Sequence, residues 1–154
     1  MLISDRYHWL LKENRQQARA QAEKLAGRLC LLASDRDAGA IQMAQANAER
    51  ASVAEWIKFS CQAISAIEPG QVEEGWVVTN PPYGLRVSAS KDLRNLYAQF
   101  GKVLQAKCPG WRIAILCNDL QLLHQTGLRL DTSLSLVNGG VPVKLARGII
   151  KGSD

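Results

Sequence analysis

The fold is decided by the stretch GWVVTNPPYG at residues 75–84. Its first half is rich in strand-forming residues, and two prolines then interrupt it. Each proline lacks a backbone N–H and has a fixed φ, so neither can continue a central strand. We therefore expect a short buried strand that ends in a stiff loop. In open α/β sheets, ligands bind at the carboxyl ends of the strands.

The polar groups of this loop suit chemistry on a planar amine. The Asn80 side-chain oxygen and the Pro81 carbonyl can each accept a hydrogen bond from an exocyclic NH2 group. Together they would hold the nitrogen lone pair towards an electrophile, while Tyr83 stacks on the attached ring. The alternative is a proline-rich turn with a core tyrosine, which a lone Pro-Pro pair would favour. The apolar strand before the tetrapeptide favours the site.

Length and composition indicate one modest globular domain. The chain has 154 residues, 47% of them hydrophobic, and a formal net charge of +5, which is compatible with RNA without being diagnostic of it. None of the four cysteines has Cys-x-x-Cys spacing and only two histidines are present, so we expect no metal site. No apolar run approaches the ~20 residues of a membrane span. We expect reduced thiols and a cytoplasmic protein.

Hydrophobic periodicity and turn residues predict helices and strands in near-alternation along the chain. Such an order gives a mostly parallel sheet with helices on both faces, and the final hairpin adds an antiparallel strand. The predicted elements are a helix at 4–26, strands at 28–33, 56–61, 76–79 and 111–117, helices at 38–51, 93–104 and 120–126, and a hairpin of 133–137 and 141–150.

Individual residues mark the boundaries of several elements. Ser4 and Asp37 are predicted helix N-caps, and Gly27 ends the first helix. Pro142 suggests that the last strand lies at a sheet edge or contains a bulge. The spacing around Tyr97 predicts a core tyrosine without a role in a site.

The first predicted helix is basic. It is either an electrostatic track for phosphates or a solvated helix face, and the second interpretation is favoured because such charge patterns are common on exposed helices.

The tetrapeptide Asn80–Tyr83 resembles the Asn-Pro-Pro-Tyr signature of class I S-adenosylmethionine-dependent methyltransferases that act on amino or amide nitrogens. The segment Ser34–Asp37 is similar to the Ser-Asp-x-Asp segment after the second strand of that family. Further segments resemble the ribosomal-RNA guanine-N2 methyltransferases that often carry a THUMP domain; they are Leu93–Tyr97, Pro109–Arg112 and Asn138–Gly139. The resemblance extends from about Trp9 to Ile150.

The resemblance implies a Rossmann-like class I methyltransferase fold, with residues 1–154 forming a single, partial catalytic domain. It implies an S-adenosylmethionine-dependent enzyme whose partner is RNA, with guanine N2 of ribosomal RNA as the methylated group. The implied catalytic residues are those of the signature, Asn80, Pro81, Pro82 and Tyr83.

The resemblance also implies a set of cofactor-binding residues. Asp35 would accept hydrogen bonds from the ribose hydroxyls, and Arg36 would flank the adenine. Relatives have an acid after the third strand, about where Ala63 stands here, so Gln62 is the candidate to replace it. Asn80 completes the implied cofactor-binding set.

One part of the family pattern has no match in this sequence. Relatives begin with a strand and a glycine-rich loop for the methionine end of the cofactor, whereas no Gly-x-Gly precedes Asp35. That strand would lie between those carrying Asp35 and Asn80, and without it backbone groups on both neighbours would lack partners. We expect the chain to be the C-terminal part of a catalytic domain, completed by a partner chain or a swapped segment.

Two alternatives remain at the level of sequence. The same chemistry can act on adenine N6 or on a protein glutamine amide. The chain can also be a non-catalytic RNA-binding or assembly remnant, which the unmatched glycine loop and Ala63 support.

Overall fold

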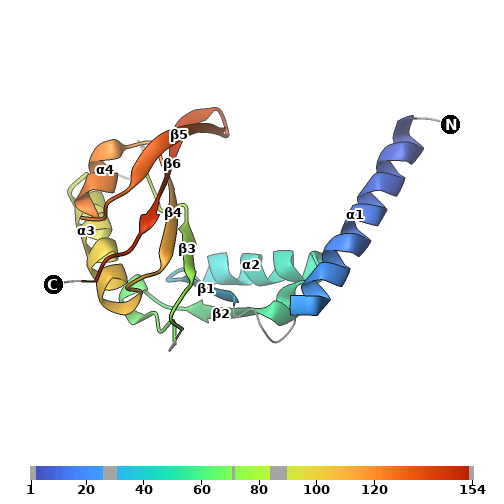
Figure 1. The fold of residues 1–154 in the computed structure, drawn as a ribbon, viewed down its shortest axis with the longest axis horizontal. Coiled ribbons are helices and arrows are strands. Elements are labelled where there is room, and N and C mark those ends of the chain that lie inside the picture. Colours follow the sequence, from blue (N-terminus) through green and yellow to red (C-terminus); the bar gives the residue numbers. More distant parts are fainter. Residues whose placement is uncertain (1–2, 26–30, 71, 84–89, 153–154) are drawn as a thin grey trace. The chain divides into compact units, whose positions relative to one another are not determined.

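Helices and strands alternate along the chain and group into two units, Met1–Cys61 and Gln62–Asp154, hereafter unit 1 and unit 2 (Figure 1). The computed structural model describes residues 3–25, 31–70, 72–83 and 90–152. The predicted helix end at Gly27 and part of the loop after the signature lie outside these residues. The α/β class that the sequence predicts is confirmed.

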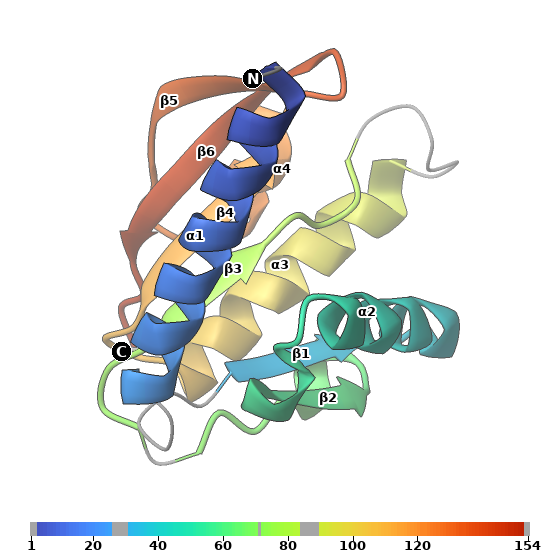
Figure 2. The ribbon, with the colours of Figure 1, turned by 90° about the vertical axis from the view of Figure 1, so that its right-hand side faces the viewer.

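In residues 3–25 and 31–61, unit 1 contains two helices, two strands and a single 3-10 turn. Their bounds are α1 Ile3–Leu25, β1 Leu31–Asp35, α2 Ala38–Arg50, η1 Ala54–Trp56 and β2 Ile57–Cys61. The strands pair in parallel, from Leu31 opposite Ile57 to Asp35 opposite Cys61. Helix α2 packs along this pair (Figure 2).

The two predicted helix caps of unit 1 have different outcomes. Asp37 is the N-cap of α2, and its carboxylate accepts a hydrogen bond from the Ala40 N–H at 2.9 Å, as predicted. The cap predicted at Ser4 is wrong, because α1 already begins at Ile3 and Ser4 lies within the helix.

Unit 2 contains a four-stranded sheet in the order β3-β4-β6-β5. The bounds of its elements are η2 Ile64–Ala66, β3 Trp76–Thr79, α3 Ser90–Lys107, β4 Arg112–Cys117, α4 Leu120–Gln125, β5 Asp131–Asn138 and β6 Val141–Ile149. Strands β3 and β4 are parallel, whereas β6 is antiparallel to both β4 and β5. The predicted antiparallel hairpin at the end of the chain is therefore confirmed, and β3 and β4 have the parallel pairing of the predicted mostly parallel sheet.

The hairpin turns at Gly139 and Gly140, which have φ of 56° and 82°. Two successive residues with positive φ are typical of a type I′ turn, where glycine avoids the steric cost of a Cβ atom. The sequence predicts an edge position or a bulge from Pro142. The edge position is wrong, because β6 lies between β4 and β5. The register shift of the hairpin lies between Asp131 and Leu134, so its extra residue is on β5 and away from Pro142. Pro142 is tolerated within β6 because the pairing of β6 with β4 stops at Lys144, so no donor is needed from Pro142 towards β4.

The core of unit 2 lies between the sheet and helices α3 and α4, which cover the same face (Figures 1 and 2). Alternate residues of β4 point into it, namely Ile113, Ile115 and Cys117. Helix α3 contributes buried residues at spacings of three and four, namely Leu93, Tyr97, Phe100 and Leu104. The core position predicted for Tyr97 is confirmed.

The strand that carries Asp35 and the strand that leads to Asn80 belong to separate sheets. Within the described residues, β1 pairs only with β2, and β3 pairs only with β4. Each of these strands also exposes apolar side chains: Leu32 is 48% exposed and Val78 is 75% exposed. Unpaired edges and exposed apolar residues are the features expected if another strand belongs beside each of them.

Candidate functional site

The Asn-Pro-Pro-Tyr loop begins where β3 ends, as predicted. Thr79 is the last residue of β3 and pairs with Ile115 at the centre of the unit 2 sheet, so the start of the loop is fixed by the core. Asn80 is exposed and Pro81 is half-buried. The loop therefore presents a side-chain amide to solvent at the carboxyl end of a parallel strand.

Tyr97, a core residue of α3, binds the backbone of this loop. Its hydroxyl donates to the Pro82 carbonyl at 3.3 Å and lies 3.3 Å from the Cys117 Sγ. Burial raises the pKa of Tyr97, and the hydrogen bond with Cys117 raises it further. The hydroxyl thus stays protonated and remains a donor.

The hydrogen bonds of this group share few hydrogens. A carbonyl can only accept, so the single hydroxyl hydrogen of Tyr97 goes to Pro82. The Cys117 thiol also has one hydrogen, and two acceptors lie within its reach, the Tyr97 oxygen at 3.3 Å and the Asp119 carbonyl at 3.5 Å. The Asp119 N–H donates to the same sulfur at 3.4 Å. The Asp119 carboxylate in turn caps α4, accepting from the Gln121 N–H at 2.8 Å. The loop is thereby connected to α3, β4 and α4.

Tyr83 is held at a second point. Its side chain is half-buried against the unit 2 core, and its hydroxyl accepts a hydrogen bond from the Asn138 Nδ2 at 3.1 Å. Asn138 is the last residue of β5, immediately before the hairpin turn. The tyrosine predicted to stack on a ring is therefore fixed at its hydroxyl end by a residue 55 positions away in the sequence.

Asp35 and Arg36 lie in unit 1, where β1 ends. The Asp35 Oδ1 accepts a hydrogen bond from the Asp37 N–H at 2.9 Å. Among the described residues no donor reaches its Oδ2, so one carboxylate oxygen is oriented and the other is available to a ligand. The Arg36 carbonyl lies 3.6 Å from the Cys61 Sγ, at the adjacent end of β2. The geometry fits the acceptor that a ribose hydroxyl requires.

Gln62 opens unit 2 and is half-buried. The segment that follows it is held by Lys107 of α3, whose Nζ donates to the carbonyls of Ser65 at 3.2 Å and Ile67 at 2.8 Å. The same Nζ lies 2.8 Å from the Glu68 carboxylate. Gln62 thus precedes a well-anchored turn, and its side-chain amide can both donate and accept.

The structure brings the loop residues together with Tyr97, Cys117 and Asn138 in unit 2, and it brings Asp35 and Arg36 together with Cys61 in unit 1. The sequence interpretation gave Tyr97 no role beyond the core. The residue type nevertheless carried a signal. A buried tyrosine hydroxyl needs a hydrogen-bond partner, whereas a leucine or phenylalanine at the same position needs none.

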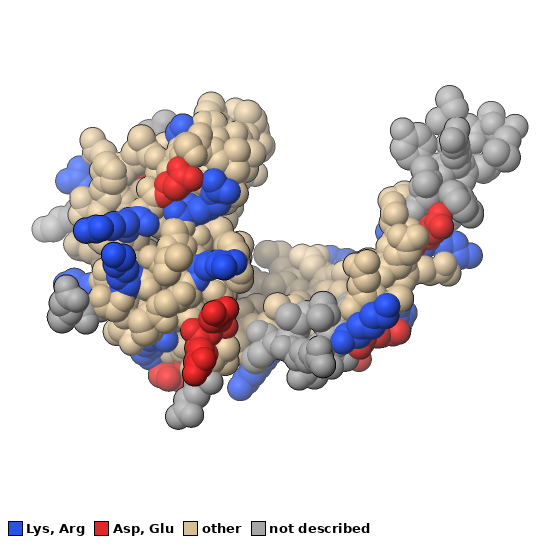
Figure 3. Space-filling model, in the orientation of Figure 1, with Lys and Arg blue, Asp and Glu red and all other residues tan. Residues whose placement is uncertain are grey.

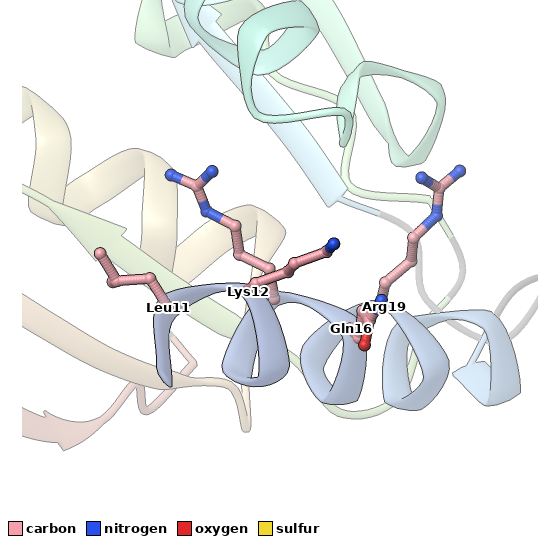
Figure 4. A pocket seen from close by; sticks show the side chains of 5 residues that line it. Leu11, Lys12, Gln16 and Arg19 are labelled. Carbon is pink, nitrogen blue, oxygen red and sulfur yellow. The ribbon is translucent and has the colours of Figure 1, made fainter. Parts of the chain in front are cut away.

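On the face in view, the lysine and arginine side chains that the structure describes are scattered among acidic and uncharged ones (Figure 3). A hollow on α1 is lined by side chains of that helix alone, with Lys12 and Arg19 extending to the same side (Figure 4). None of the predicted site residues lines it.

Neither a membrane span nor a metal cluster is found in the part of the chain that the structure describes. None of its helices is long and apolar enough to cross a bilayer. Its histidine, cysteine and acidic side chains form no group of three that would hold a metal ion.

Comparisons with known proteins agree on one family. The model of UPF0020, described as an RMKL-like methyltransferase domain, matches residues 1–146. The ribosomal RNA large subunit methyltransferase K/L of Shewanella frigidimarina is 36% identical over 133 residues, which cover 86% of this chain and 18% of that protein. The protein of the same name from Legionella pneumophila (strain Lens) is 38% identical over 136 residues, covering 88% and 19%. The chain therefore spans about a fifth of the length of these curated relatives.

A solved structure has a similar fold. A predicted N6-adenine-specific DNA methylase from Listeria monocytogenes matches with a TM-score of 0.66 and 26% identity. The match covers 96% of this chain and 38% of that one, so the fold is of the Rossmann-like methyltransferase type.

Proposed function

We propose a function from one established premise: the chain belongs to the UPF0020 family of RMKL-like methyltransferase domains. We infer that it forms part of an S-adenosylmethionine-dependent enzyme that methylates ribosomal RNA on an exocyclic amine, guanine N2. The observation that carries this proposal is the loop after β3, with an exposed Asn80 amide and a backbone fixed to the core. The names of the relatives support the choice of ribosomal RNA.

The loop residues act on the amine. Bound S-adenosylmethionine supplies a methyl group on a sulfonium, which is already activated for transfer. The Asn80 Oδ1 and the Pro81 carbonyl accept hydrogen bonds from the amine and aim its lone pair at the methyl carbon. The same acceptors stabilise the positive charge that develops on nitrogen. Tyr83 stacks on the base, which must be extruded or single-stranded to reach the loop.

The cofactor is held mainly by residues of unit 1. The available oxygen of Asp35 accepts from the ribose, Arg36 flanks the adenine, and the Gln62 amide hydrogen-bonds the adenine edge. No residue of this sequence is assigned to the methionine end of the cofactor.

The unpaired edges of β1 and β3 support the proposal that an added strand completes the catalytic domain. We infer that residues 1–154 work as one catalytic domain when a further strand, from the same longer protein or from a partner chain, pairs with those edges. The enzyme binds RNA and acts in the cytoplasm.

The test is methyl transfer by this chain joined to the segment that precedes the matching region in the Shewanella frigidimarina relative. Unmodified large-subunit ribosomal RNA is the substrate, and labelled methyl groups are counted on it. Asn80→Ala should lower turnover by about a hundredfold, through loss of amine alignment, and should lower cofactor affinity by much less. Asp35→Ala should instead weaken cofactor binding roughly tenfold, as loss of a hydrogen bond to a charged group would.

Gln121→Ala serves as the matched control, because it also removes an exposed amide side chain of unit 2, on α4, and this side chain makes no hydrogen bond to the described residues of the loop. It should change neither quantity. Equal losses in turnover and cofactor affinity for Asn80→Ala would contradict the division of roles.

A second substrate is favoured by one observation, the similarity to a protein named as an N6-adenine-specific DNA methylase. Adenine-containing DNA and a glutamine peptide therefore belong in the same assay. Methylation of either in preference to ribosomal RNA would move the proposal to that substrate. Absence of any transfer would favour the non-catalytic module.

A further inference from the structure

We propose that Tyr97 and Asn138 are positioning residues that clamp the Asn-Pro-Pro-Tyr loop at two points, one on its backbone and one on its aromatic side chain. The inference deepens the proposed function and rests on it. The clamp leaves Asn80 and the Pro81 carbonyl directed at the substrate amine.

The need for a clamp follows from the two prolines. Neither Pro81 nor Pro82 has a backbone N–H, so the backbone of this part of the loop can hydrogen-bond to the rest of the protein only through its carbonyl groups. A donor from elsewhere must therefore reach it. The Tyr97 hydroxyl does so, at 3.3 Å from the Pro82 carbonyl.

Tyr97 is well placed to be a rigid donor. Its side chain is 1% exposed and lies in the core formed by α3, α4 and the sheet. The hydroxyl also contacts the Cys117 Sγ at the end of β4. A side chain fixed by packing and by a second hydrogen bond loses little further freedom when it binds the loop.

The choice of carbonyl has a consequence for chemistry. Tyr97 binds Pro82, and within the described residues nothing donates to the Pro81 carbonyl. The clamp thus occupies the neighbour of the proposed acceptor and leaves the acceptor open to an amine.

The second point of the clamp controls Tyr83. The Asn138 Nδ2 donates to the Tyr83 hydroxyl at 3.1 Å, from the last residue of β5, next to a two-glycine turn. The aromatic ring is thereby fixed at the core on one side and at its hydroxyl on the other. A base stacked on this ring would meet Asn80 in a defined orientation, because the hydrogen bond and the core contacts restrict rotation of the ring.

The clamp is tested with Tyr97→Phe and Asn138→Ala in the full chain. The backbone order parameter of the Tyr83 amide, measured by NMR relaxation, should fall from a rigid value of about 0.85 towards the flexible range below about 0.6 in both variants. In the completed enzyme, the turnover number should fall roughly tenfold while the affinity for S-adenosylmethionine stays unchanged.

Thr126→Val is the matched control. The Thr126 hydroxyl is also buried and also makes two hydrogen bonds, to the Leu123 carbonyl at 2.7 Å and from the Leu128 N–H at 3.2 Å, but it does not touch the loop. Its loss should lower the melting temperature without changing the Tyr83 order parameter or turnover. Asn138→Asp should keep the Tyr83 order parameter and the turnover number of the unmutated protein, unlike Asn138→Ala, because the carboxylate can accept the Tyr83 hydroxyl hydrogen.

The outcomes separate the clamp from the proposed function. An unchanged Tyr83 order parameter in Tyr97→Phe and Asn138→Ala would overturn the clamp, whatever the activity. Equal losses of turnover in these variants and in Thr126→Val would also overturn it, because they would reflect stability alone. If the unmutated enzyme transfers no methyl group, the proposed function fails, and the order parameters still decide whether the loop is clamped.

Discussion

The two units differ in how much they bury. Within the described residues, unit 1 buries only two apolar side chains, Ile41 and Ala48, whereas unit 2 has an extended core that includes Leu104, Ile115 and Leu123. Unit 1 has a two-stranded sheet and exposes Leu31 and Leu32 on one of its two strands, whereas the sheet of unit 2 has four strands.

This difference has a physical meaning for the site. A two-stranded sheet with few buried residues gains little from apolar burial, and three or more strands with an apolar face are generally needed for independent stability. The clamped loop proposed to bind the base belongs to the well-packed unit. The proposed ribose-binding residue Asp35 belongs to the unit with little core, so cofactor binding should depend on added structure more than loop geometry does.

The largest expected effect comes from matched glycine substitutions. A Cβ on Gly101 of α3 would lie 1.8 Å from the Thr126 carbonyl oxygen at the end of α4, so Gly101→Ala must push the helices apart and should cost about 3 kcal/mol. In unit 1, a Cβ on Gly39 of α2 would lie 3.0 Å from the Asp37 Oδ1 that caps the helix, so a shift of a few tenths of an ångström in this exposed side chain relieves the contact. Gly39→Ala should change stability by less than about 1 kcal/mol, since better helix propensity offsets the contact.

Urea unfolding followed by circular dichroism measures both variants. A loss from Gly39→Ala as large as that from Gly101→Ala would show that unit 1 is as tightly packed as unit 2, and the comparison between them would break down.

A smaller effect is expected in the pH dependence of the stability of unit 2. Hydrogen bonds from the Ser133 side chain and N–H, and then the Arg147 guanidinium, lower the pKa of Asp131 in β5 to about 2 from its ordinary 3.8. A carboxylate with a lowered pKa stabilises the fold above the unfolded-state pKa, and this contribution is lost as the pH falls through the folded-state pKa. Unit 2 should therefore lose a small part of its stability between about pH 4 and pH 2.

Thermal unfolding across that pH range, compared with Asp131→Asn, measures this contribution. The substitution should flatten the pH dependence of the melting temperature. An unchanged slope would mean that the ionised Asp131 carboxylate, with its bonds from Ser133 and from Arg147 at 3.0 Å, contributes nothing to the stability of the hairpin.

The features that were predictable from sequence are local ones. The Asp37 cap depends on residues three positions apart, and the strand before Asn80 depends on its own composition. The family resemblance was likewise carried by short contiguous segments, and it is confirmed. The Ser4 cap failed even though it is local, because Ser4 turned out to lie inside a helix that begins earlier.

The remaining features depend on residues that are distant in sequence. Whether Pro142 stands at an edge is decided by which strand pairs beside β6, and the proline itself carries no information about that. The contacts of the clamp join residues 15 and 55 positions apart, so the periodicity that placed Tyr97 in the core could not identify Pro82 as its partner. Only the unmet need of a buried hydroxyl indicated that a partner exists.

The most direct test of the account is calorimetric binding of S-adenosylmethionine to this chain alone and to the chain joined to the preceding segment of the Shewanella frigidimarina relative. We expect binding only by the joined form. The proposed cofactor residues Asp35 and Arg36 belong to unit 1, and in the described residues 31–61 its strands β1 and β2 pair only with each other. Equally tight binding by residues 1–154 alone would contradict the account, since unit 1 would then form its share of the site without an added strand.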